Sequence, residues 1–313
     1  MLKCLGPNSR KQYNVLDNLI YNTAIWSEDF TMSKMITIPK KTNAKKCEDY
    51  RTISLIPHSS KIILKTIYDR IYKKKIDACL GWDQFGFRSG MGTRDAIGTL
   101  RVIIEKSIEF GKSLYISFVD YEKAFDRVNW MKLMEVLEII GLDFSERKLI
   151  WELYVNQKAL IQVGEEMTEP AEIGQGARQG GTLSSILFNV YVQFLINEAM
   201  EENNDGVNIN GNLINSIRFA DDQAMISHTN VGLQRIMNDL ASVGKKYGMR
   251  INVTKTKGMR INHQGKTQMK LIVDDAKLEI VEKFTYLGSM ITNDGRCEHE
   301  IKVRIAKGKA SFF

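Results

Sequence analysis

Two neighbouring carboxylates, Asp221 and Asp222, stand between two short apolar runs in residues 216–226. Aspartate favours turns and the flanking residues favour strands, so the stretch predicts a β-hairpin with the Asp pair at its tip. Adjacent carboxylates repel one another, and a divalent cation stabilises them together. Taken alone, such a pair is more often a solvated turn than a metal site.

A second Asp pair in the chain tests how much the local pattern means. Asp274 and Asp275 lie between Leu271-Ile272-Val273 and Leu278-Glu279-Ile280, in nearly the same local context. We interpret this twin pair as a turn. The local pattern therefore does not select Asp221 and Asp222, and other residues must do so.

A third carboxylate, Asp120, ends the alternating apolar segment 114–119, which predicts a strand. Ligands of open sheets bind at the carboxyl ends of strands, so Asp120 is a candidate ligand. Asp126 follows six residues later and is interpreted differently, as the N-cap of a helix over 127–140 that Gly141 ends.

Two glycine-rich segments accompany these carboxylates. Residues 84–93 contain three glycines and two phenylalanines. They suit either the stacking of bases on the rings or a tight turn before a helix that starts near Arg94. Residues 174–182 lead into an amphipathic helix, whose N-terminus is suited to phosphate, although they match neither the phosphate-loop nor the dinucleotide pattern.

The chain is basic, and its charge is unevenly distributed. It carries a net charge of +7, with fifteen Lys and Arg against seven Asp and Glu in residues 1–80. Residues 244–270 add eight basic residues and no acidic one. Positive blocks around a carboxylate-bearing middle suit an enzyme that holds a polyanion, and solvated lysine-rich surface explains the charge equally well.

Bulk composition excludes several classes of protein. Hydrophobic residues make up 43% of the 313 residues and charged residues 26%, which excludes a disordered chain. No apolar run approaches the roughly 18 residues of a membrane span. The four cysteines are scattered, which predicts reduced thiols in an intracellular protein without a zinc site. Strands and helices alternate irregularly, which indicates an α+β fold.

Taken in order, the motifs resemble the reverse transcriptase domain of non-LTR (LINE-type) retrotransposons. The resemblance spans about residues 30–290 and rests on Ile38-Pro39-Lys40-Lys41, Tyr50-Arg51-Thr52-Ile53-Ser54-Leu55, Gln84-Phe85-Gly86-Phe87-Arg88, Phe118-Val119-Asp120-Tyr121-Glu122-Lys123-Ala124-Phe125-Asp126, Arg178-Gln179-Gly180, Leu187-Phe188-Asn189, Phe219-Ala220-Asp221-Asp222, Lys255-Thr256-Lys257 and Tyr286-Leu287-Gly288.

The resemblance implies a right-hand polymerase fold, with an antiparallel palm sheet backed by helices. Its fingers would cover residues 1–110, and its palm residues 111–292 with a helical insert over 127–200. Residues 293–313 would start a thumb that is mostly missing. The absence of a preceding endonuclease and the short thumb are expected of a fragment of a mobile element's open reading frame.

The resemblance also implies a site. Asp120, Asp221 and Asp222 would be the catalytic residues and would hold two Mg²⁺ ions, with Mn²⁺ as the alternative. The implied nucleotide-binding residues are Lys40 and Arg51 at the triphosphate, Phe125 as a steric gate against ribose, Gln179 and Gly180 at the nascent base pair, and Lys255 near the pyrophosphate. Tyr286, Leu287 and Gly288 would grip the primer.

The implied activity is RNA-directed DNA polymerisation, a two-metal nucleotidyl transfer. Its partners would be an RNA template, a DNA primer and deoxynucleoside triphosphates, and no membrane is expected. The protein would be intracellular, and nuclear if it acts like its family. No oligomeric state is implied. The alternative is a catalytically weak or inactive nucleic-acid-binding remnant. An RNA-directed RNA polymerase is disfavoured by the bulky Phe125.

Overall fold

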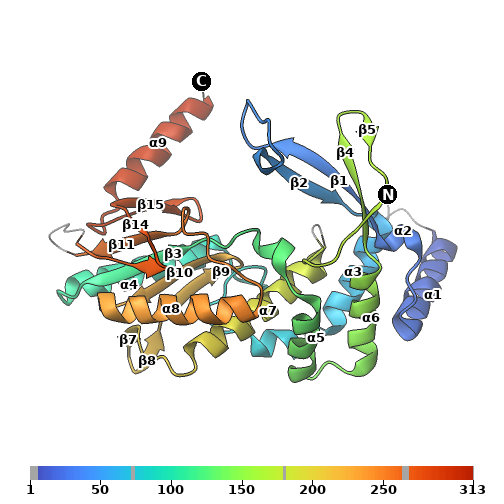
Figure 1. The fold of residues 1–313 in the computed structure, drawn as a ribbon, viewed down its shortest axis with the longest axis horizontal. Coiled ribbons are helices and arrows are strands. Elements are labelled where there is room, and N and C mark those ends of the chain that lie inside the picture. Colours follow the sequence, from blue (N-terminus) through green and yellow to red (C-terminus); the bar gives the residue numbers. More distant parts are fainter. Residues whose placement is uncertain (1–5, 72–74, 179–180, 263–267, 313) are drawn as a thin grey trace. The chain divides into compact units, whose positions relative to one another are not determined.

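The computed structural model describes residues 6–71, 75–178, 181–262 and 268–312. The chain forms two compact units, each made from two separate segments. Met1–Cys79 and Phe125–Tyr191 form the first unit, and Leu80–Ala124 and Val192–Phe313 form the second. Each unit has its own five-stranded sheet (Figure 1). Both units mix helices with strands, as the sequence predicts, and the boundaries of fingers, palm and thumb stay predictions.

The first unit is organised around a sheet with the strand order β2-β1-β4-β5, in which β6 also pairs with β4. Strand β1 runs parallel to β4 and antiparallel to β2. Its elements are α1 (Pro7–Thr23), α2 (Glu28–Thr31), β1 (Met32–Pro39), β2 (Tyr50–Leu55), α3 (His58–Ile71), α5 (Trp130–Ile139), α6 (Phe144–Val155), β4 (Lys158–Val163), β5 (Glu166–Met167) and β6 (Ala171–Glu172), with 3-10 turns at Cys47–Asp49, Asp77–Cys79 and Ala124–Arg127. Proline ends β1, where its missing N–H costs no ladder bond.

Gly176, in the first part of the glycine-rich segment 174–182, packs against the turn that precedes α5. Gly176 has a φ of +100°, and a Cβ there would lie 3.0 Å from the backbone of Asp126. Trp130 Nε1 donates to the Gly176 carbonyl at 2.8 Å. The close approach and the positive φ both require glycine at this position.

The predicted cap of α5 is wrong by three residues. Asn129 is the N-cap, and its side chain accepts a hydrogen bond from Lys132 N at 3.0 Å. Asp126 lies instead in the 3-10 turn Ala124–Arg127. Both residues are good caps by type, and the 3-10 turn that contains Asp126 delays the start of the helix to Trp130.

The second unit contains a sheet with the strand order β14-β11-β3-β10-β9. Strand β3 is central and runs antiparallel to both β10 and β11. The elements of the second unit are α4 (Thr93–Glu109), β3 (Leu114–Val119), β7 (Val207–Ile209), β8 (Asn212–Ile214), β9 (Ser216–Phe219), β10 (Asp222–Ser227), α8 (Asn230–Lys246), β11 (Lys257–Ile261), β12 (Ile272–Val273), β13 (Ala276–Lys277), β14 (Glu279–Ile280), β15 (Lys283–Tyr286), β16 (Ser289–Thr292) and α9 (Glu298–Phe312). Helix α7 (Thr182–Met200) begins in the first unit and ends in the second.

The sheet of the second unit is covered by helices, and alternation along its strands decides what each face buries. Leu114, Ile116 and Phe118 of β3 belong to the same buried cluster as residues of α4. Helix α8 lies along β10 and β3 (Figure 1). It buries Leu233, Ile236, Met237 and Leu240, at the spacing of one helical face. No helix within the described residues is long and apolar enough to span a membrane.

Helix α8 should contribute to stability through this buried face. Leu240 is 0% exposed, so Leu240→Ala leaves a cavity and should lower the free energy of unfolding by about 2–5 kcal/mol in urea titrations. Val231, on the same helix, is 61% exposed, and Val231→Ala should change it by less than about 0.5 kcal/mol. Equal effects of the two substitutions would contradict this packing.

Candidate active site

The Asp221–Asp222 stretch forms a β-hairpin, as the sequence predicts. Strands β9 and β10 pair antiparallel with Asp222 opposite Phe219, so Ala220 and Asp221 form a two-residue loop. The tip is thus one residue earlier than expected, because Asp222 already begins β10. Ala220 has a φ of +58°, which is uncommon for a residue other than glycine.

Asp120 lies beside this hairpin. Strands β3 and β10 pair with Val119 opposite Gln223, and continuing that antiparallel register by one residue places Asp120 opposite Asp222. The backbone of Asp120 is held from the other side by the segment after α8. Asn252 N donates to the Asp120 carbonyl at 2.8 Å, and Asp120 N donates to Thr256 Oγ1 at 3.1 Å.

The three carboxylates are close enough to perturb one another. Burial, and then the charges of Asp222 and Asp120, raise the pKa of Asp221 to about 6. Burial and the charge of Asp120 also raise the pKa of Asp222, although that residue begins β10 at a position open to solvent. Charged carboxylates are thus unfavourable here without a cation to balance them.

The residues fit a divalent cation in chemistry. Within the described residues, no three His, Cys, Asp or Glu side chains are already gathered as a metal site. Asp120 Oδ1 is nevertheless buried without a hydrogen-bond donor. A buried carboxylate oxygen without a donor, beside two carboxylates of raised pKa, is the kind of oxygen set that Mg²⁺ binds.

The twin pair differs from this site in its surroundings. Asp274 and Asp275 have positive φ values of 47° and 62° and form the loop between β12 and β13, so the predicted turn is confirmed. Both are exposed, and Asp274 pairs with Lys245 on α8. Two similar sequences therefore form two hairpins, and the one at Asp221 lies beside a third carboxylate, that of Asp120.

The predicted primer grip is a third hairpin in the same unit. Leu287 and Gly288 both have positive φ and form the loop between β15 and β16, with Tyr286 opposite Ser289. Tyr286 is buried, and its hydroxyl donates to the Ile217 carbonyl at 2.9 Å and lies 3.4 Å from that of Asp222. Tyr286 thus contacts both strands of the Asp hairpin through its hydroxyl, and a grip on the primer stays a prediction.

Lys255 brings a positive charge close to the carboxylate of Asp120. Its Nζ lies 3.6 Å from Asp120 Oδ1, and its side chain is largely exposed. Lys257, two residues on, pairs with Glu279 instead. Lys255 therefore partly balances Asp120, and its role at a pyrophosphate stays a prediction.

The other predicted nucleotide-binding residues belong to the first unit. Lys40 follows β1 and is exposed, with its backbone N donating to the Asp49 carbonyl. Arg51 lies in β2 opposite Ile38. Phe125 is half-buried and stacks on Phe188 at 4.1 Å. Gln179 and Gly180 lie outside the described residues.

Sequence reasoning missed a buried ion pair behind the hairpin. Arg218 of β9 is fully buried, and its guanidinium donates to both carboxylate oxygens of Asp83 at 2.6 and 2.8 Å and to Gln193 Oε1 at 2.9 Å. Burial raises the pKa of Asp83, but Arg218 and Ser216 together hold it below its usual range. The available signal was an arginine within an apolar strand, three residues before Asp221.

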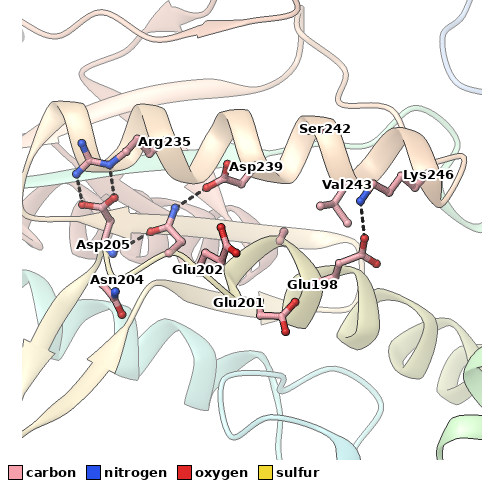
Figure 2. Close-up of a pocket in the computed structure, with 12 residues that line it drawn as sticks. Glu198, Glu201, Glu202, Asn204, Asp205, Arg235, Asp239, Ser242, Val243 and Lys246 are labelled. Atoms are coloured by element: carbon pink, nitrogen blue, oxygen red, sulfur yellow. Dashed lines mark hydrogen bonds and ion pairs between the residues drawn. The ribbon is translucent and has the colours of Figure 1, made fainter.

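A cavity lies elsewhere in the second unit, between the end of α7 and α8 (Figure 2). It has a volume of about 650 Å³, and four of its charged side chains form two ion pairs. Arg235 pairs with Asp205 at 2.6 Å, and Lys246 with Glu198 at 2.7 Å. None of the predicted site residues lines it.

The chain is similar to known proteins over most of its length. A family model for reverse transcriptase (RNA-dependent DNA polymerase) matches residues 38–291. The retrovirus-related Pol polyprotein from the type-2 retrotransposable element R2DM of Drosophila melanogaster is 24% identical over 294 residues, which cover 88% of this chain and 27% of that protein. The corresponding protein of the type-1 element R2 of Popillia japonica is 25% identical over 270 residues, or 83% of this chain and 37% of that protein.

Solved structures are similar as well. Apo telomerase from Candida tropicalis, truncated from its C-terminal domain, has a TM-score of 0.55 at 16% identity, over 90% of this chain and 58% of that one. Telomerase from the same organism with a fragment of telomeric RNA has a TM-score of 0.54 at 16% identity, over 89% of this chain and 47% of that one. At this identity the likeness concerns the fold, and it confirms the predicted polymerase fold.

The raised pKa of Asp221 predicts how stability depends on pH. The folded chain binds this proton more tightly than the unfolded chain, so stability falls as pH rises from about 4 to 6 and the loss is complete above 6. In metal-free buffer at pH 7.5, Asp221→Asn should therefore raise the free energy of unfolding by about 1–3 kcal/mol, and by near zero at pH 4.

The control is Asp275→Asn in the exposed turn, which should change stability little at either pH. Urea titrations at the two pH values measure both variants. An Asp221→Asn gain that is the same at both pH values would contradict an electrostatic origin.

Proposed function

The chain belongs to the reverse transcriptase (RNA-dependent DNA polymerase) family, and on this premise we propose that it is the catalytic part of an RNA-directed DNA polymerase of a non-LTR retrotransposon. The chain spans about a quarter to a third of the length of the Pol polyproteins that it matches. One observation carries the proposal: the strand register places Asp120 beside the Asp221–Asp222 hairpin, within the matched region.

The proposed reaction extends a DNA primer on an RNA template. The primer 3′-hydroxyl attacks the α-phosphorus of a deoxynucleoside triphosphate, the new P–O bond forms, and the bond to the pyrophosphate oxygen breaks. Such a transfer depends mainly on positioning and on the neutralisation of charge. The telomerase with telomeric RNA among the similar structures supports a nucleic acid as the partner.

Asp120, Asp221 and Asp222 would hold the metal ions, Mg²⁺ or Mn²⁺. Two such ions supply activation of the attacking hydroxyl and stabilisation of the leaving group in polymerases. The carboxylates of the chain supply the negative charge that this needs, and burial and mutual repulsion raise the pKa of Asp221. Lys255, whose Nζ lies 3.6 Å from Asp120 Oδ1, would supply a positive charge near the pyrophosphate.

Residues of the first unit take their roles from the family motifs that they match. Arg51 and Lys40 would bind the triphosphate, and Gln179 with Gly180 would contact the new base pair. Phe125, five residues after Asp120, would exclude the 2′-hydroxyl of ribonucleotides. Tyr286, Leu287 and Gly288 in the second unit would hold the primer end.

The two Asp pairs provide a matched test of the polymerase. Asp221→Asn with Asp222→Asn should lower Mg²⁺-dependent primer extension on an RNA template by more than about 10³-fold, because it removes charge where the transition state needs it. Asp274→Asn with Asp275→Asn is the same change in the twin turn and should leave extension near wild type.

Comparable extension by both double variants would contradict the proposal. Salt-dependent binding of RNA by a wild-type chain that extends no primer would favour the nucleic-acid-binding remnant instead.

The steric gate gives a second test. Phe125→Val removes the ring and should raise the relative incorporation of ribonucleotides over deoxynucleotides by about 10–100-fold, the range that pocket contacts of this size provide. Single-nucleotide extension with each substrate measures it. Unchanged sugar selectivity would show that Phe125, which stacks on Phe188, serves packing alone.

A further inference from the structure

The glycine-rich segment 84–93 begins with a stretch that pairs with the Asp hairpin. Residues 81–86, here called the anchor segment, run beside β9 with Gln84 paired to Arg218 as an isolated parallel bridge. Arg218 N donates to the Asp83 carbonyl at 2.8 Å, and Phe85 N donates to the Arg218 carbonyl at 2.8 Å. The anchor segment thus extends the sheet edge behind the carboxylates.

Gln84 bonds directly to the tip of the hairpin. Its side chain is 0% exposed, and Oε1 accepts from Gly86 N at 2.8 Å and from Ala220 N at 3.0 Å. Ala220 immediately precedes Asp221 and has the strained φ of +58°. One amide oxygen therefore satisfies the N–H of the residue whose backbone sets the direction of Asp221.

Gly86 leaves room for that contact. A Cβ at this position would lie 2.6 Å from Ala220 N and 3.0 Å from the carbonyl carbon of Phe219. Both are backbone atoms of the hairpin, so a methyl group would have to displace the hairpin itself. Gly98 in α4 has no atom within 4 Å of the same position, which makes it a matched control.

The anchor segment is itself fixed in place. Its Asp83 is ion-paired with the fully buried Arg218. Phe85 belongs to the buried cluster that α4 and the sheet share. Because both ends of the contact are held, a change at Gln84 or Gly86 is transmitted to the hairpin tip and is not absorbed by the loop.

We propose that Gln84 and Gly86 are positioning residues, which set the backbone of Ala220 and so the orientation of Asp221 and Asp222. The kinetic consequence rests on the proposed polymerase function, whereas the effect on the hairpin backbone does not. Neither residue needs to touch substrate. By sequence, residues 84–93 suit either base stacking or a tight turn. We give Gln84 and Gly86 a different role, in positioning the hairpin.

The test compares amide hydrogen exchange at Ala220 with the kinetics of primer extension. In the wild-type chain, the Ala220 amide should exchange about 100-fold or more slowly than in an unstructured peptide. Gln84→Met removes the acceptor and Gly86→Ala adds the methyl group, and each should speed that exchange by about tenfold or more, while the amides of β3 stay protected.

The same variants should lower kcat by about 10–100-fold, with the KM for the deoxynucleotide within about threefold, because misplacement of the carboxylates affects the transition state. Gln84→Glu keeps an acceptor oxygen and should slow the exchange of Ala220 relative to Gln84→Met. Gly98→Ala should change neither exchange nor kcat.

Three results would overturn the inference. They are free exchange of Ala220 in the wild type, unchanged exchange in both Gln84→Met and Gly86→Ala, and faster exchange in an active enzyme whose kcat is unchanged. Exchange of Ala220 in the wild type is measured without any variant, so the test still decides the inference if a substituted chain fails to fold. A wild-type chain that extends no primer would count against the polymerase proposal, while the exchange data still decide the backbone claim.

Discussion

The pairing of β3 with β10 is the interaction on which the rest of the site depends. It brings Asp120 to Asp222 across about a hundred residues of chain. Side chains alternate along a strand, so a slip of one residue would turn Asp120 to the other face of the sheet. Packing on the faces of the sheet holds that register, because a slip would also move Ile116 and Phe118 out of the buried cluster that they share with α4.

The fold concentrates negative charge where it is unfavourable. Burial and neighbouring charge raise the pKa of Asp221, and Asp120 Oδ1 lacks a donor. Such a site stores an electrostatic cost in the free chain that a bound cation would remove, and sites of this kind are common where function opposes stability. Contacts from the surrounding structure hold the hairpin backbone in place against this repulsion. They are made by Tyr286 to the strands of the hairpin, by Gln84 to its tip and by the Asp83–Arg218 ion pair at β9.

Local patterns predicted the local structure well. The end of β3 at Val119, the hairpin at Asp221 and the turn at Asp274 all follow from alternation and turn preferences, which act over a few residues. Long-range partners were not predictable in this way. Asp83 and Arg218 are 135 residues apart, and neither residue type signals the other. The N-cap of α5 was misplaced at Asp126 because Asn129 is an equally good cap by type. The 3-10 turn that contains Asp126 distinguishes the two positions.

The central claim is that Asp120 and the Asp221–Asp222 hairpin form one cation site. Fe²⁺ in place of Mg²⁺, with ascorbate and peroxide, cuts the backbone close to where the ion binds, and the fragments map the site without any need for activity. The account predicts cuts near residue 120 and near residues 221–222 that Mg²⁺ suppresses together, and none near residues 274–275. Cleavage at only one of the two predicted positions, or equal cleavage at the twin pair, would contradict it.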